Sequence, residues 1–241
     1  SRVEGHGKVS LLLDDDDRVQ QARLHIVEFR GFEKFIQGRP YWEIPVLVQR
    51  LCGICPVSHH LAAAKALDQI VGADRLTPTA DKIRRLKHYG QILQSHALHF
   101  LHLSSPDLLF GFDSDVARRN IVGVAAEYRE IARQGVLLRR YGQEVIKATA
   151  GKRVHGTGAI PGGVNKSLTR EERSELLEDI YQIVGWCREA VQLAKRLHLS
   201  NPGLYNSFGV FRSNMLSLVG PDGDMDLYHG ELRARDSNGN I

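Results

Sequence analysis

At residues 50–60 the chain reads Arg50-Leu51-Cys52-Gly53-Ile54-Cys55-Pro56-Val57-Ser58-His59-His60, a stretch that contains two of its three cysteines. Cys52 and Cys55 are separated by two residues, so both thiolates can point at one soft metal ion, and the glycine between them allows a tight backbone turn. Pro56 suits the first turn of a helix, because its missing N–H costs nothing there, and we predict a helix that ends near Gly72. The stretch therefore predicts a metal-binding turn at a helix N-terminus, whose positive end favours thiolate over thiol.

A C-x-x-C pair alone fits half of a zinc site, a redox dithiol or a pair of iron–sulfur ligands. A structural zinc site needs four ligands, usually with a second cysteine pair. The sequence contains no second pair, because Cys187 stands alone inside a helical pattern, where we interpret it as a packing residue. The chain therefore carries half of a metal site, and the other half lies elsewhere or comes from histidines.

Four histidines could supply such ligands from one predicted helix. Pairs of them are three residues apart, a spacing at which two imidazoles can share a metal ion. No carboxylate pairs with them as in di-iron bundles, so we interpret them instead as a polar helix face in a buried bundle. These residues are His88, His96, His99 and His102.

Three motifs in order resemble those of one known family. The pattern R-x-C-G-x-C-x-x-x-H at residues 50–59 resembles the N-terminal metal motif of the large subunit of nickel–iron hydrogenases. Residues 2–7 resemble the R-x-E-G-H opening of that family, and residues 29–33 resemble its R-G-x-E segment. The similar run covers residues 2–72, and the Gly-Gly-Val at residues 162–164 extends it.

The resemblance assigns a role to five residues. Cys52 is expected to be a terminal nickel ligand, and Cys55 is expected to bridge nickel and iron. His59 would donate a hydrogen bond to a bridging thiolate and so tune the metals. Glu33 would bind Mg²⁺, and Glu4 would be the first stop of the proton path, with a pKa that burial raises toward the working pH.

Each of the last three roles has a simpler alternative. His59 could pack in the helical bundle without touching the metals. Glu33 could be a surface carboxylate paired with Lys34 or Arg30. Glu4 could form a salt bridge with a neighbouring basic side chain, Arg2 or Lys8.

The implied function is the reversible oxidation of H2 to protons and electrons. The implied cofactors are a nickel–iron centre with diatomic ligands on iron, Mg²⁺, and iron–sulfur clusters on a partner subunit. Residues 27–35 and 58–61 are most similar to the cytoplasmic, NAD-linked bidirectional branch, so we expect NAD-reducing diaphorase subunits as further partners. NAD should bind there, because this chain has no dinucleotide fingerprint.

Two other functions fit part of the sequence. One is the metal-free relative of this family in respiratory complexes, a structural and quinone-binding subunit that is expected to lack Cys52 and Cys55. The other is an interaction protein in which zinc, or the cysteines alone, supply stability. Bound nickel would separate the hydrogenase from both.

One departure from the family pattern concerns its second cysteine pair. The D-P-C-x-x-C-x-x-H motif that the family has near its C-terminus is absent here. We therefore expect residues 1–241 to be the N-terminal portion of one large-subunit domain. It would comprise a β-hairpin region with the approach to the metal site (1–50), a helical bundle (51–200) and an irregular or β segment (201–241).

Composition excludes several classes of function. A net charge of +4 is only mildly basic, and no basic stripe carries interleaved aromatic residues, so nucleic-acid binding is a poor interpretation. No apolar run reaches the length of a membrane span. Two neighbouring cysteines and one isolated cysteine form no disulfide framework, which favours a reducing compartment, the cytoplasm.

The hydrophobic pattern predicts a mainly α fold with a small N-terminal antiparallel β element, an α+β class built on a long-helix bundle. Residues 8–13 and 19–28 are β-like runs, the second with the alternation of a half-buried strand. Long helices are predicted from Thr77 to about Leu199, with Gly123, Gly135 and Gly142 as weak points. Residues 41–48 fit a strand or a short helix. The glycine-rich residues 151–163 lack nucleotide-binding spacing, and we expect them to pack against a partner.

Overall fold

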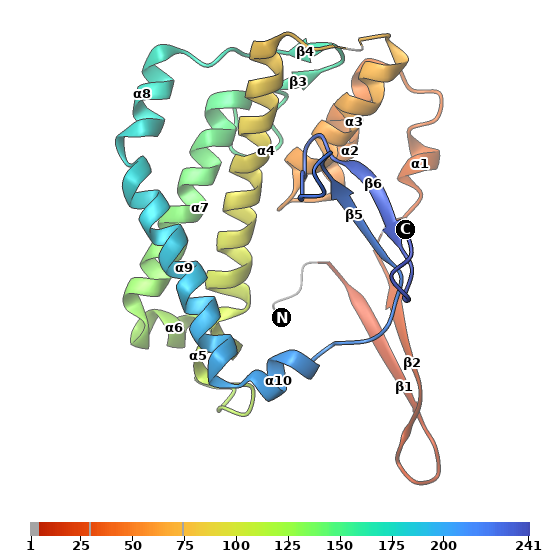
Figure 1. Ribbon diagram of the computed structural model, residues 1–241, viewed down its shortest axis with the longest axis vertical. Coiled ribbons are helices and arrows are strands. Elements are labelled where there is room, and N and C mark those ends of the chain that lie inside the picture. The colour runs from red at the N-terminus through yellow and green to blue at the C-terminus, as the bar shows by residue number, and fades with distance from the viewer. Residues whose placement is uncertain (1–4, 29, 74) are drawn as a thin grey trace.

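The long helices form the frame of the molecule (Figure 1). The computed structural model describes residues 5–28, 30–73 and 75–241. The prediction of a mainly α fold with small antiparallel sheets is confirmed. The helical elements are α1 (Phe32–Phe35), α2 (Ile44–Val48), α3 (Pro56–Ile70), α4 (Pro78–Leu98), α5 (Ser105–Phe110), α6 (Ile121–Glu127), α7 (Arg129–Ala150), α8 (Arg170–Glu178), α9 (Ile180–Ser200) and α10 (Pro202–Ser207), with 3-10 turns η1 (Tyr41–Glu43) and η2 (Gln49–Leu51) and a π-helical turn η3 (His99–Leu103).

Helix ends follow local chemistry that the sequence makes visible. Thr77 caps α4, with its hydroxyl oxygen accepting the N–H of Ala80 at 3.3 Å. Thr169 and Glu172 form a capping box at the start of α8, as a threonine followed three residues later by a glutamate indicates. Residues 41–48, for which the sequence allows a strand or a helix, are helical. None of the helices in the described ranges is long and apolar enough to cross a membrane.

Helices α4 and α7 pack closely because glycines lie at their contact. A Cβ built on Gly90 would lie 2.7 Å from Val145, and one built on Gly142 would lie 2.7 Å from the Cβ of Gln94. The expectation that Gly135 and Gly142 weaken the helix is wrong, since α7 passes through both without interruption. Gly142 lets α7 approach α4, and Gly135 lets it approach η3, where an added Cβ would lie 2.7 Å from the Cβ of Leu101, so these contacts stabilise the helical conformation.

The core beside the cysteine turn joins segments that are far apart in sequence. Its buried side chains come from α3, α7, the short strand β3 (Ala159–Ile160) and the chain just before strand β6 (Glu231–Arg235). Burying each leucine- or isoleucine-sized side chain contributes roughly 1.5–3 kcal/mol. The members are Val57, Leu61, Ala64, Ile146, Ala150, Ala159 and Tyr228.

The glycine-rich segment docks on this core. Strands β3 and β4 (Gly163–Val164) form a small antiparallel pair. Buried Arg84 of α4 donates to the carbonyls of Ile160 (2.6 Å) and Gly163 (3.1 Å) and to the carboxylate of Asp68 (2.6 Å). Asp68 also accepts the N–H of Gly162 at 2.7 Å. Part of the polar backbone of this loop therefore bonds within the chain, and the expectation that residues 151–163 also pack against a partner stays a prediction.

Two longer hairpins complete the fold. The antiparallel pair β1 (Gly7–Leu13) and β2 (Val19–Ile26) projects away from the helices (Figure 1), and β5 (Met215–Val219) pairs with β6 (Glu231–Arg235). The prediction of a half-buried strand at β2 is wrong for this chain, because both Leu24 and Ile26 are exposed. Period-two alternation marks a face that can be buried, and within the described residues no second layer covers it.

Candidate metal centre

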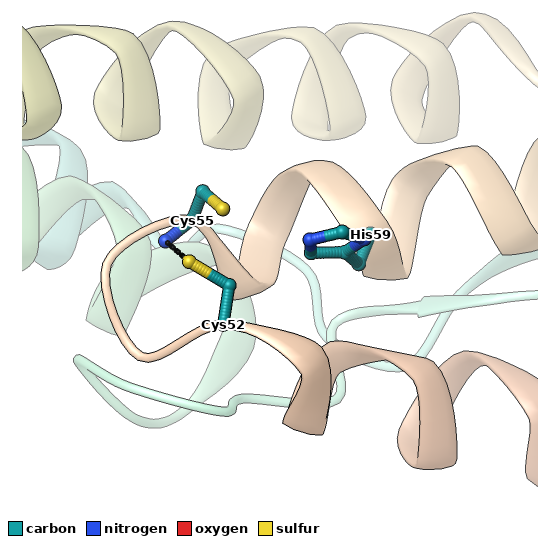
Figure 2. A group of neighbouring side chains, drawn as sticks. All are labelled: Cys52, Cys55 and His59. Atoms are coloured by element: carbon teal, nitrogen blue, oxygen red, sulfur yellow. Dashed lines mark hydrogen bonds between the residues drawn. The ribbon is translucent and has the colours of Figure 1, made fainter. Parts of the chain in front are cut away.

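The cysteine turn connects η2 to α3. Cys52 is extended and follows directly after η2, and Cys55 is the N-cap residue of α3, with Pro56 at the first helical position as predicted. The backbone N–H of Cys55 donates to the Sγ of Cys52 at 3.1 Å, which holds the turn closed (Figure 2).

His59 lies one helical turn after Cys55 and faces the same space. One ring nitrogen points toward the two cysteines (Figure 2). The ligand atoms of Cys52, Cys55 and His59 all lie within 4.8 Å of one another, and all three residues are half-buried. Among the described residues these three make the group of histidine, cysteine and acidic side chains that could hold a metal ion.

Two glutamines of α4 hold the turn from behind. Gln91 and Gln94 both donate from Nε2 to the carbonyl of Ile54, at 3.0 and 2.7 Å. Both side chains are buried, so these bonds are shielded from competing water. The sequence does not identify this pair. Two glutamines spaced three residues apart share a helix face, but their spacing does not show which loop that face will contact.

His60 points to the opposite side and has a structural role. Its side chain is 1% exposed, its Nδ1 bonds to the carbonyl of Pro45 at 2.8 Å, and its Nε2 accepts the N–H of Ala159 at 3.1 Å. Burial, and next the charge of Lys87, lowers the pKa of His60 to about 4. The imidazole is therefore neutral and joins α2 and β3 to α3.

The structure separates the other predicted residues from this group. Cys187 lies in α9 against a second core cluster, and burial raises the pKa of its thiol. Glu33 is exposed in the short helix α1 and does not join the cysteines and His59. Glu4 lies outside the described residues. Among the described residues, the metal group includes none of the four histidines at positions 88, 96, 99 and 102.

The donor set fits a soft or borderline metal ion. Two thiolate sulfurs and one imidazole suit nickel, iron or zinc rather than magnesium or calcium. Even if all three side chains coordinate the ion, a four-coordinate metal keeps at least one position for a ligand from outside the chain. The arrangement can therefore anchor a transition metal on one side while leaving the other side accessible to substrate or to further ligands.

Two family models match the chain. The model described as nickel-dependent hydrogenase matches residues 30–113, which include the whole turn and all of α3 and α4. The model described as HoxL-like matches residues 1–29. The matched ranges adjoin, so together they cover the chain continuously from residue 1 to residue 113.

Curated relatives extend the similarity over the full chain. The chain is 45% identical over 252 aligned residues to the NAD-reducing hydrogenase HoxS subunit beta of Cupriavidus necator, covering 100% of this chain and 52% of that protein. It is 44% identical to a subunit of the F420-non-reducing hydrogenase vhu of Methanocaldococcus jannaschii, covering 97% of this chain and 55% of that protein. The chain spans about half the length of the curated relatives it matches.

Solved structures show the same fold. The crystal structure of an NAD+-reducing NiFe-hydrogenase in the H2-reduced state superimposes with a TM-score of 0.95 at 62% identity, covering 100% of this chain and 53% of that one. A NiFeSe-hydrogenase of Dm. baculatum superimposes with a TM-score of 0.75 at 25% identity, covering 99% of this chain and 54% of that chain. With the two cysteines and His59 converging in a matched segment, the chain belongs to the nickel-dependent hydrogenase large-subunit family.

Proposed function

We propose that this chain is the N-terminal portion of the catalytic subunit of a nickel–iron hydrogenase, which reversibly oxidises H2 to protons and electrons. The observation that carries the proposal is the convergence of Cys52, Cys55 and His59 within 4.8 Å at the start of α3. The similarity of the whole chain to proteins named as hydrogenases supports it. When bound, the nickel–iron centre, with diatomic ligands on iron, supplies the activation of H2.

Within that function the two thiolates hold the metals. We assign Cys52 as a terminal nickel ligand and Cys55 as the ligand shared between nickel and iron. Support comes from the turn itself, because the N–H of Cys55 donates to the Sγ of Cys52 and the two glutamines of α4 hold the carbonyl of Ile54 between the cysteines. A preformed pair of donors lowers the ordering cost of metal binding. The metal-free relative is expected to lack both cysteines, which this chain has, and the similarity to proteins named as hydrogenases favours nickel over zinc at this donor set.

His59 is proposed to act beside the metals. Its ring nitrogen faces the sulfurs from the second turn of α3, a position from which an N–H can donate to the thiolate of Cys55 (Figure 2). Such a bond would withdraw electron density from the sulfur and tune the metals.

Two carboxylates complete the proposed site. Glu33, an exposed acid in the first turn of α1, would bind Mg²⁺ together with water and groups from outside the chain. Glu4 would carry the proton away from the metals. The assembled enzyme with Glu4→Gln tests the second role, since it should keep nickel but lose exchange of hydrogen for deuterium.

The electrons require partners. We propose an iron–sulfur small subunit next to this chain, because three cysteines cannot hold both this site and a four-cysteine cluster. NAD would bind further diaphorase subunits, by analogy with the relative named an NAD-reducing hydrogenase. A cytoplasmic location follows from the same analogy and from the sparse cysteines.

Replacement of one ligand tests the proposed function. In the assembled enzyme, Cys52→Ser should lose nickel and with it H2 oxidation, because the harder hydroxyl is a poor ligand for nickel. Metal analysis of the purified complex is the measurement. Cys187→Ser is the matched control and should keep both nickel and activity, since Cys187 packs in a separate cluster. Full nickel content in the Cys52→Ser enzyme would refute the proposal.

A further inference from the structure

The two glutamines behind the cysteine turn donate to a single oxygen. The Nε2 of Gln91 lies 3.0 Å from the carbonyl oxygen of Ile54, and the Nε2 of Gln94 lies 2.7 Å from it. Both glutamine side chains are buried, at 2% and 4% exposure. A carbonyl is satisfied by one donor, whereas here both of its lone pairs face an amide N–H. The need to satisfy this carbonyl therefore does not explain the second glutamine.

The carbonyl of Ile54 and the N–H of Cys55 belong to the same peptide group. That N–H donates to the Sγ of Cys52 at 3.1 Å (Figure 2). A peptide group is one resonance unit, so hydrogen bonds to its oxygen draw electron density from its nitrogen and make its N–H a stronger donor. The glutamines, the peptide group and the sulfur thus form one chain of hydrogen bonds, which leads from α4 to a proposed nickel ligand.

The contact between α4 and α7 holds Gln94 in this position. A Cβ built on Gly142 of α7 would lie 2.7 Å from the Cβ of Gln94 and 2.8 Å from its backbone nitrogen. The backbone of α7 therefore lies directly against Gln94, which cannot shift without moving α7. A donor fixed in this way needs no reorganisation when charge changes at its acceptor.

We propose that Gln91 and Gln94 are positioning residues that act on the sulfur of Cys52 through the peptide group between Ile54 and Cys55. By strengthening the hydrogen bond to this sulfur, they withdraw electron density from it and raise the reduction potential of the metal that it binds. Hydrogen bonds to ligand sulfurs tune copper and iron–sulfur centres in the same way. The inference rests on the proposed function, in which Cys52 is a terminal nickel ligand.

A role limited to closing the turn makes a different prediction. If the glutamines only held the turn, their removal would release nickel or would leave the properties of bound nickel unchanged. If they polarise the peptide group, nickel stays bound and its reduction potential falls further with each donor removed. The potential of the bound nickel therefore separates the two roles.

The test uses the assembled enzyme with Gln91→Met, with Gln94→Met and with both substitutions. Methionine is similar in length to glutamine and has no N–H to donate. Gln69→Met is the matched control, because it repeats the substitution at an exposed position of α3, the helix that begins at the turn. The main readout is the midpoint potential of the nickel, followed by electron paramagnetic resonance, with nickel content measured in parallel.

Each single variant should keep its nickel and show a lower midpoint potential than wild type. The double variant should show a larger downward shift than either. The direction follows because a sulfur with a weaker hydrogen bond is more electron-rich and favours the oxidised metal. The resonance lines of the nickel should move together with the potential. Gln69→Met should match wild type in both measurements.

An unchanged potential in the double variant with full nickel content would overturn the proposal. The two single variants, each of which keeps one donor on the carbonyl, decide in the same way if the double variant does not fold. Loss of nickel from both single variants would also overturn it, because the glutamines would then only hold the turn. Failure of the proposed function shows separately, in the wild type: an enzyme without nickel at Cys52 would overturn that function and this inference with it.

Discussion

Adjacent histidines at the start of α3 have different roles because their side chains point in different directions. His59 faces the two sulfurs, whereas His60 turns into the interior and joins three segments of backbone. A one-residue shift on a helix rotates a side chain by roughly 100°, which is enough to move it from a metal site to the core. The chemistry of each imidazole is therefore decided by its place on the helix.

His60 should make the protein sensitive to acid. Its folded pKa of about 4 lies below the ordinary value of 6.5, so the unfolded chain binds the extra proton first. Stability is therefore fully present above pH 6.5 and is lost as pH falls toward 4, by up to about 3 kcal/mol. Urea unfolding of the purified protein at pH 7 and pH 4.5 measures this loss.

Two variants separate His60 from other titrating groups. His60→Gln cannot titrate, so it should be less stable than wild type at pH 7 but should lose less stability on acidification. His25→Gln, at an exposed histidine of β2, should behave as wild type. If His60→Gln shows the full wild-type dependence on pH, another group is responsible.

At the scale of elements, the contact between α4 and α7 determines where the cysteine turn is supported. The glycines of these helices allow close packing, and α4 then presents Gln91 and Gln94 to Ile54. Close packing also leaves little room for change at the contact. The position of the metal-binding turn thus depends on a helix pair that carries no metal ligand.

Gly142→Ala should therefore destabilise the protein. The added Cβ would lie 2.7 Å from both the Cβ of Gln94 and the carbonyl oxygen of Gly90, closer than atoms can approach. This overpacking should cost about 1–3 kcal/mol and should exceed the gain in helix propensity of about 1 kcal/mol. Thermal or urea unfolding measures the difference.

Gly185→Ala in α9 provides the matched control. A Cβ at Gly185 meets no atom within 4 Å, so the same substitution should stabilise the protein by up to about 1 kcal/mol. Equal stability of the two variants would contradict the role of Gly142 in helix packing.

The contact between α4 and α7 shows which features of the fold can be predicted from the sequence and which cannot. The cysteine turn, the start of α3 at Pro56 and the capping box at Thr169 follow from local rules, and the structure confirms them. The packing role of Gly142 and the support from Gln94 depend on which surfaces of two distant helices meet. The spacing of residues within one segment does not show which surfaces will meet. A glycine that permits close helix packing therefore looks, in the sequence, like one that weakens the helix.

At the scale of the whole molecule, the described residues surround the proposed metal position from one side only. Helix α3 and the preceding turn supply two sulfurs and an imidazole, and the chain spans about half the length of the curated relatives it matches. The β1–β2 hairpin likewise leaves apolar side chains such as Leu24 and Leu11 exposed, and no other described element covers them. We therefore place the proposed activity in an assembly that includes more than the residues described here.

Locating nickel in the assembled enzyme tests the central claim most directly. Anomalous diffraction at the nickel absorption edge should give a peak at bonding distance from the Sγ atoms of both Cys52 and Cys55, with Cys187 remote from it. A nickel peak elsewhere, or a zinc signal at the two sulfurs of an active enzyme, would contradict the assignment of this turn as the nickel-binding site.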